Sequence, residues 1–111
     1  MDERSRRIGR NEALFRQVNE ELEGLIRGLA EITDETFHIV CECGDLRCQK
    51  RLVVPASDYE TVRAESGLFF VLPGHERPSA EDVVRTGPVY NVVRKRPGEP
   101  EQVAKATDPR R

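Results

Sequence analysis

The sequence predicts an α+β fold in which a long N-terminal amphipathic helix precedes a small, mainly antiparallel sheet with one short helix. Three observations lead to this prediction. Apolar residues recur at helical spacing near the N-terminus, and short apolar runs separated by turn residues follow them. All the cysteines lie between positions 41 and 48. With 111 residues, the chain is expected to form one domain.

The composition limits both the size of the core and the classes of function. Charged residues make up 34% of the chain, hydrophobic residues 37% and aromatic residues only 5%. Such a thin core makes an additional staple, such as a bound metal, plausible. The net charge of -2 argues against bulk nucleic-acid binding.

The same sequence carries no sign of export or membrane insertion. The opening residues lack the apolar segment of a secretory signal, and no apolar run approaches the ~18 residues of a membrane span. A cytoplasmic location, without a membrane partner, is therefore expected. Thiols stay reduced in that compartment, so closely spaced cysteines are more typical of metal ligands than of disulfides.

A helix is predicted over residues 9–33, after a frayed N-terminus at residues 1–8. Apolar positions alternate at spacings of four and three, which is the a/d pattern of a heptad repeat. Asn11 is its polar member, and Gly24 and Gly28 each weaken the helix by up to about 1 kcal/mol. We call the apolar members the helix seam: Phe15, Val18, Leu22, Leu25, Leu29 and Ile32.

The helix seam has two explanations. It packs on the sheet of its own chain, or it docks on a protein partner or on a second copy of the chain. Packing on its own sheet is the more ordinary explanation, whereas its length of more than three turns and the small size of the remaining domain support the second. The sequence leaves both open, and the seam is a candidate partner-binding surface.

Residues 34–96 are expected to form an α+β domain stapled by zinc, and short strands are predicted along it. Each predicted strand is a short run rich in β-branched or aromatic residues. The first two would pair across the cysteine cluster, the third would be a central strand, and the last two would form a hairpin. The predicted strands are 37–40, 50–54, 68–72, 83–85 and 89–93.

A short helix and a tail complete the organisation. Ser57 and Glu60 have the spacing of a capping box, which predicts a helix from Asp58 to about Ser66. Residues 97–111 are rich in proline, glycine and charge, so a disordered C-terminal tail is expected.

The cysteine cluster indicates a metal site. Cys41, Cys43 and Cys48 form a Cys-x-Cys-x4-Cys pattern within a polar loop. Structural zinc commonly takes three thiolates and one imidazole in a tetrahedron. Cys41 and Cys43 face the same side if strand alternation holds, and Gly44 permits the sharp bend that returns Cys48 to the same ion. The sequence therefore predicts one zinc per chain, held in a zinc knuckle.

The fourth ligand has to come from elsewhere in the chain. His75 follows a predicted strand end and a Pro-Gly turn, which would aim its ring, and Glu76 is a candidate acceptor for the other ring nitrogen. His38 is the rival, but it lies three residues before Cys41 and so on the opposite strand face. His75 is the preferred ligand.

These blocks also resemble those of a group of small actinobacterial proteins of unknown function. The resemblance rests on residues 11–20, on Cys41-Glu42-Cys43-Gly44-Asp45 with Cys48, and on residues 70–76. It extends from about residue 8 to residue 93 and implies only that the blocks belong to one small domain.

Three functions remain in competition. The leading one is a non-enzymatic, zinc-binding protein-interaction module that would suit a regulatory role, because four protein ligands leave no open metal position and no catalytic constellation is recognisable. The alternative is a zinc–thiolate redox sensor that releases its metal on oxidation. The weakest of the three is nucleic-acid binding through the basic C-terminal tail or through the arginines near the N-terminus: Arg4, Arg6, Arg7 and Arg10.

Overall fold

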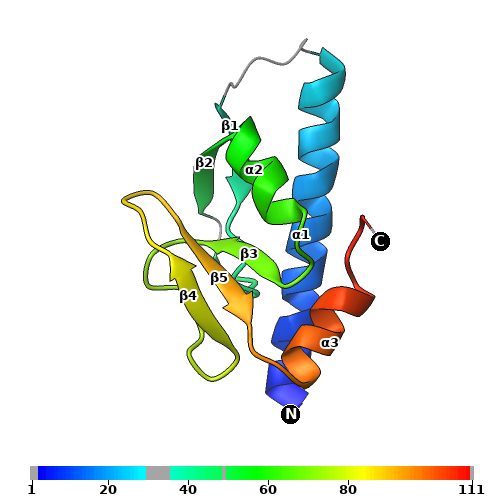
Figure 1. The fold of residues 1–111 in the computed structure, drawn as a ribbon, viewed down its shortest axis with the longest axis vertical. Coiled ribbons are helices and arrows are strands. Elements are labelled where there is room, and N and C mark those ends of the chain that lie inside the picture. Colours follow the sequence, from blue (N-terminus) through cyan, green and yellow to red (C-terminus); the bar gives the residue numbers. More distant parts are fainter. Residues whose placement is uncertain (1–2, 30–35, 49, 111) are drawn as a thin grey trace.

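The computed structural model describes residues 3–29, 36–48 and 50–110, and the side chains of residues 26–29 are not described. A long helix stands along one side of two small sheets, with two shorter helices packed beside it (Figure 1). The elements are α1 (Glu3–Leu29), β1 (Thr36–Val40), β2 (Arg51–Pro55), α2 (Ala56–Arg63), β3 (Leu68–Val71), β4 (Glu81–Arg85), β5 (Asn91–Lys95) and α3 (Glu99–Ala106).

The predicted α+β class is confirmed, with two small antiparallel sheets in place of one. Strands β1 and β2 pair from Thr36 opposite Pro55 to Val40 opposite Arg51. The second sheet has the order β3-β5-β4, so the hairpin of β4 and β5 is also present. Strand β3 is an edge strand of this sheet, and the expectation that it would be central was wrong.

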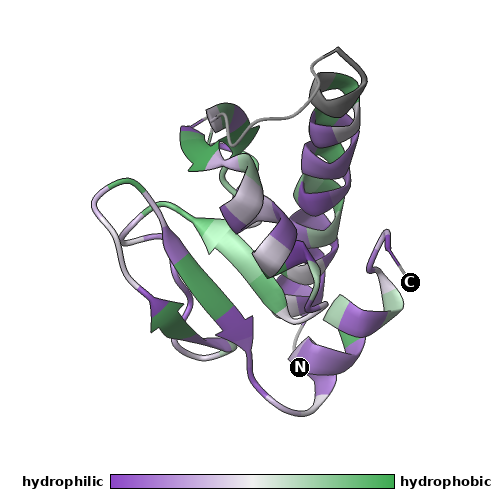
Figure 2. Cartoon of the chain, turned by 45° about the horizontal axis from the view of Figure 1, so that its top comes forward, coloured by the Kyte–Doolittle hydropathy of each residue, from purple (hydrophilic) through white to green (hydrophobic). Residues whose placement is uncertain are grey.

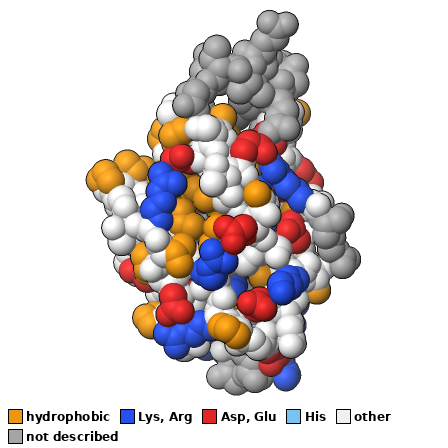
Figure 3. Space-filling view, in the orientation of Figure 1, with side chains coloured by type: hydrophobic (Ala, Val, Ile, Leu, Met, Phe, Trp, Pro, Cys, Tyr) orange, Lys and Arg blue, Asp and Glu red, His pale blue; other side chains and the backbone are white. Residues whose placement is uncertain are grey.

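Apolar character is concentrated in the strands, whereas the exterior is densely charged. Figure 2 shows hydrophobic colour on β3 and within β5, and long hydrophilic stretches on α1. On the face seen in Figure 3, positive and negative side chains are interspersed, with hydrophobic side chains between them. None of the described helices combines the length and the apolar character that crossing a membrane requires.

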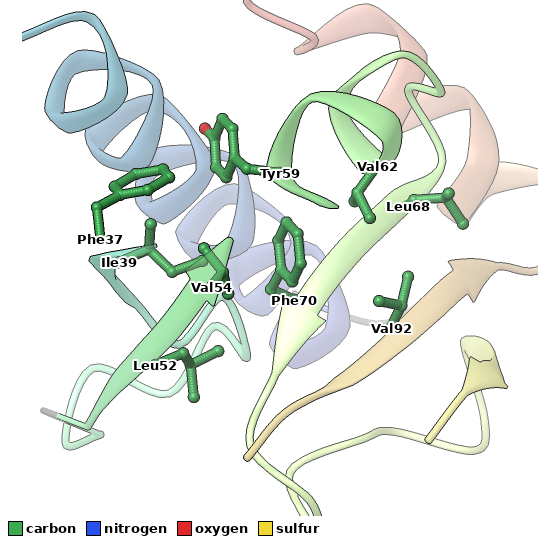
Figure 4. Close-up of a cluster of buried hydrophobic side chains, with 9 residues drawn as sticks. All are labelled: Phe37, Ile39, Leu52, Val54, Tyr59, Val62, Leu68, Phe70 and Val92. Atoms are coloured by element: carbon green, nitrogen blue, oxygen red, sulfur yellow. The ribbon is translucent and has the colours of Figure 1, made fainter. Parts of the chain in front are cut away.

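Strand β3 is buried on both faces, which explains why its sequence is uniformly apolar. Phe70 lies in a cluster with residues of β1, β2, α2 and β5, and its ring stacks on Tyr59 with centroids 5.8 Å apart (Figure 4). Phe69 and Val71 face the other way, into a cluster that contains Cys41 and Cys43. The core therefore joins the predicted ligand cysteines to the middle of the molecule.

Helix α1 packs on the domain through polar side chains rather than through the helix seam. Glu12, Arg16 and Asn19 are its buried residues among those whose side chains are described. They lie one position along from the seam, and one residue turns a helix by about 100°. Within the seam, Phe15, Val18 and Leu22 are half-buried and Leu25 is 66% exposed. The side chain of Leu29 and all of Ile32 lie outside the described residues, as does the predicted helix end near residue 33.

The buried side chains of α1 have specific partners, although Arg16 Nε is buried without a hydrogen bond among the described residues. Lys95 Nζ donates to Glu12 Oε2 at 2.6 Å and to Glu81 Oε1 at 2.5 Å. Arg16 donates to the Ala104 carbonyl at 2.7 Å, and its guanidinium lies 4.3 Å from the centre of the Phe69 ring. Such groups stabilise a buried interface only when they are paired, so each one fixes the position of α1.

Both ends of the chain are more ordered than the sequence suggested. Helix α1 begins at Glu3, so the frayed segment expected at 1–8 is instead helical from that residue. Residues 97–111 were expected to be disordered, but they contain α3. Proline near the first helical position suits a helix start. At the other end, Arg16 donates a hydrogen bond to the Ala104 carbonyl, one of the carbonyls that a helix leaves without an internal partner.

The start of α2 also differs from the prediction. The helix begins at Ala56 after Pro55, and no side chain caps it, so Ser57 is not the N-cap. Glu60, the expected partner in the capping box, pairs with Arg110 at 2.8 Å. The Glu60 carboxylate therefore pairs with a distant arginine and takes no part in a capping box. The expected inner face, with Tyr59 and Val62 buried, is present.

The buried Glu12 carboxyl gives stability a measurable pH dependence. Burial raises its pKa from 4.5 to about 7, although Lys95 opposes the shift. A raised pKa means that the folded state favours the protonated carboxyl. The contribution of Glu12 to the free energy of unfolding is therefore complete below its pKa in the unfolded chain and is lost as the pH rises through about 7. We expect the stability advantage of the wild type over E12Q to fall between about pH 5 and about pH 8 in urea unfolding. A pH-independent difference would contradict this.

Candidate metal centre

The structure brings the predicted ligands Cys41, Cys43, Cys48 and His75 together. Their donor atoms all lie within 4.8 Å of one another. His75 Nδ1 lies 3.8 Å from Cys41 Sγ and 3.6 Å from Cys48 Sγ. A tetrahedral ion with zinc-like bonds separates a sulfur and a nitrogen ligand by roughly 3.6 Å and two sulfurs by roughly 3.8 Å. The two distances from His75 match this geometry, and all four donors lie close enough together to share one metal ion.

The first two ligands are placed by the end of the β1–β2 hairpin. The Cys41 amide donates to the Lys50 carbonyl at 3.1 Å, which extends the pairing of β1 and β2 into the loop. We call residues 41–48 the cysteine loop. A turn closes it, in which the Cys48 amide donates to the Asp45 carbonyl at 3.0 Å. The hairpin thus ends in a loop whose three thiols converge.

Gly44 makes this loop possible for two reasons. Its φ is +80°, a backbone conformation that costs other residues about 1–2 kcal/mol. A Cβ atom at this position would also lie 2.7 Å from the Ile8 carbonyl and 2.8 Å from Glu12 Cγ. Asn11 donates to the Gly44 carbonyl at 3.0 Å, so α1 rests directly on the loop.

His75 reaches the thiols from the turn that follows β3. Its amide donates to the Leu72 carbonyl at 2.9 Å, and Gly74 adopts a φ of +93°. Glu76 accepts hydrogen bonds from the Gly74 amide at 3.1 Å and from Asn91, so this carboxylate organises the turn rather than orienting the His75 ring. His38, the rival ligand, is exposed on β1, opposite Val53 of β2.

The protein environment favours the thiolate form at Cys43, whereas Cys41 and Cys48 are shifted toward the thiol. The Cys41 thiol donates to Cys43, which lowers the pKa of Cys43 to about 5 and raises the pKa of Cys41. Burial raises the pKa of Cys48. Backbone amides stabilise negative sulfur, and the Leu72 amide donates to Cys41 Sγ at 3.2 Å. Hydrogen bonds from the backbone of Asp45 and Lys50 act in the same way on Cys43 and Cys48.

The donor set identifies the class of metal that fits. Three thiolates and one imidazole are soft and borderline ligands, which suit zinc and disfavour calcium or magnesium. Cys41 and Cys43 are 2% and 6% exposed, so most of the site is shielded from water. The arrangement can hold one metal ion between the cysteine loop and the turn after β3, two segments that are distant in sequence.

Glu42 is the important residue that sequence reasoning missed. It lies between two ligand cysteines, so strand alternation turns its side chain away from the thiols and into the protein, where it is fully buried. Its carboxylate accepts hydrogen bonds from Arg63 at 3.1 Å, from Asn19 at 2.7 Å and from the Phe70 amide at 2.9 Å. The alternation that aligned the cysteines was the signal that could have revealed this orientation.

Comparisons with protein-family models, with curated proteins and with solved structures found no match to this chain. The function is therefore argued from the geometry of the site and of the surfaces around it.

The close packing at Gly44 makes a direct test of the loop. We expect Gly44→Ala to lower the free energy of unfolding by at least about 2 kcal/mol, because it adds backbone strain and a clash with α1. Gly24→Ala is the matched control, since nothing lies within 4 Å of its added Cβ, and it should stabilise the protein by up to about 1 kcal/mol. Equal effects of the two changes in urea unfolding would refute the structural role of Gly44.

Proposed function

We propose that the protein is a non-enzymatic zinc-binding module that serves protein interaction, with the metal in a structural role. The observation that carries the proposal is the set of four protein donors that lie within 4.8 Å of one another. A catalytic zinc keeps one position open for water or substrate, and four protein ligands leave none. The Cys3His set is one of the common structural sets.

Bound zinc would join two parts of the fold. Cys41, Cys43 and Cys48 lie in the loop between β1 and β2, whereas His75 follows β3 of the other sheet. A structural zinc contributes roughly 10–16 kcal/mol of apparent binding free energy in small domains. Typical net stabilities are about 5–15 kcal/mol, so zinc binding is of the size needed to decide whether this domain folds.

The exposed side of α1 supports a docking role for the helix seam. Leu25 of the seam is 66% exposed, and Leu14, which lies beside the seam, is 54% exposed; the two are three helical turns apart on nearly the same side. The polar side chains Glu12, Arg16 and Asn19 hold the opposite side of the helix against the domain. We therefore keep a protein partner or a second copy of the chain as the proposed occupant of this side.

A redox-sensor role has less support from the geometry. The thiols are close enough to react with one another, but Cys41 and Cys43 are buried. Oxidation follows thiolate character and exposure, and among the three thiols only Cys48 is partly exposed.

The metal assignment is tested by elemental analysis of protein purified without added metal. We expect one zinc per chain in the wild type, none in Cys48→Ser and a strongly reduced content in His75→Ala, because each change removes a ligand. His38→Ala is the matched control and should keep its zinc, since His38 is exposed on β1. Full retention of zinc in His75→Ala, or no zinc in the wild type, would overturn the proposed site.

The docking role of α1 is tested by light scattering over a range of concentrations. If the helix pairs with its own copy, the wild type should approach the mass of a dimer, and the double change Leu14→Glu with Leu25→Glu should keep it monomeric. Val53→Glu with Val84→Glu adds the same charge at exposed strand positions and should leave pairing unchanged. A wild type that is strictly monomeric at high concentration would eliminate the second-copy version.

A further inference from the structure

A groove that is rich in arginine runs beside the metal centre. It has a volume of about 610 Å³, within the range of ligand-binding pockets. Three segments form it: the first turns of α1, the cysteine loop, and the turn that contains Gly74 and His75. Cys43 and His75 line one wall, so the groove borders the metal site directly.

Arginines from all three segments converge on this groove: Arg4, Arg7, Arg47 and Arg77. Asp45 is the one carboxylate among the described lining residues, and it pairs with Arg47 at 3.4 Å. A zinc ion with three thiolates and one imidazole adds a single negative charge. The groove therefore keeps an excess of positive charge, in a protein whose net charge is -2.

The arginines of α1 fall into two groups. Arg6 pairs with Glu99 at 3.5 Å and Arg10 pairs with Glu3 at 3.4 Å, and neither lines the groove. For the guanidinium groups of Arg4, Arg7 and Arg77, the described part of the chain offers no carboxylate at ion-pair distance. The arginines that face the groove are thus the ones left available for a ligand.

The remaining lining residues indicate which kind of anion fits. Ile8 and Leu46 provide apolar surface, and Leu46 is 64% exposed. Proteins that bind single-stranded nucleic acid stack bases on aromatic side chains, and the described lining contains none. Arginine forks bind carboxylates as well as phosphates. An acidic peptide with an apolar residue satisfies both the charge and the exposed leucine.

We propose that this groove binds an acidic peptide segment of a partner protein, with carboxylates on Arg4, Arg7 and Arg77 and an apolar side chain against Ile8 and Leu46. The proposal rests on the interaction-module function and locates a partner site separate from the helix seam. Because two metal ligands form one wall, zinc also fixes the shape of the groove.

The test uses the zinc-loaded full chain and fluorescein-labelled synthetic peptides in anisotropy titrations. One peptide alternates aspartate and glutamate around a central leucine, and the second replaces each acid with its amide. We expect the acidic peptide to bind, the amide peptide to bind at least about tenfold more weakly, and binding to weaken with added salt. A single-stranded oligonucleotide and inorganic phosphate are titrated in parallel.

Two double variants with equal charge changes separate the groove from general electrostatics. Arg7→Gln with Arg77→Gln should weaken peptide binding about tenfold, whereas Arg6→Gln with Arg10→Gln should change it less than about twofold. Zinc content and urea unfolding of each variant establish that the fold is retained, and Arg4→Gln replaces Arg77→Gln if it is not.

The proposal is overturned if the acidic peptide does not bind at low salt, or if both double variants weaken it equally. It is also overturned if the oligonucleotide or phosphate binds more tightly through the same arginines. None of these outcomes affects the zinc assignment, because the metal content of the wild type is measured independently.

Discussion

The buried carboxylate of Glu42 is the contact on which the arrangement of this protein depends. It receives hydrogen bonds from Asn19 of α1, Arg63 of α2 and the backbone of Phe70 in β3. The Glu42 amide also donates to the Phe70 carbonyl at 2.8 Å. The chain between the two ligand cysteines thus covers the free edge of β3 and links the two sheets. One side of this short segment carries the thiols of Cys41 and Cys43, and the other carries the Glu42 carboxylate with its hydrogen-bond partners.

The polar contacts of α1 determine where the helix lies on the domain. Asn19 donates to the Val40 carbonyl at 2.9 Å and accepts the Val40 amide at 2.8 Å, so its side chain completes the edge of β1 as a neighbouring strand would. Breaking a buried charged pair typically costs about 3–5 kcal/mol, whereas the intact pair adds little net stability. We infer that these contacts fix where α1 lies, while the apolar clusters and the metal provide most of the stability.

Sequence patterns predicted the strands and the convergence of the cysteines, because alternation and turn residues are local properties. They failed where a long-range partner decides the outcome. Arg16 of α1 bonds a carbonyl at the end of α3, and Glu60 of α2 pairs with Arg110 near the C-terminus. The apolar repeat left the buried side of α1 undecided, and the structure buries the polar side chain of Glu12, which pairs with Lys95. No periodicity in a single sequence reveals such pairings.

The central claim is that metal binding in the cysteine loop holds both sheets together through the segment around Glu42. Hydrogen exchange of the wild type, with zinc bound and after chelation, tests this most directly. The account predicts that removing zinc reduces protection both in the loop and at the Phe70 and Leu72 amides, which bond to Glu42 and to Cys41. Loss of protection confined to the cysteine loop, with β3 unchanged, would contradict it.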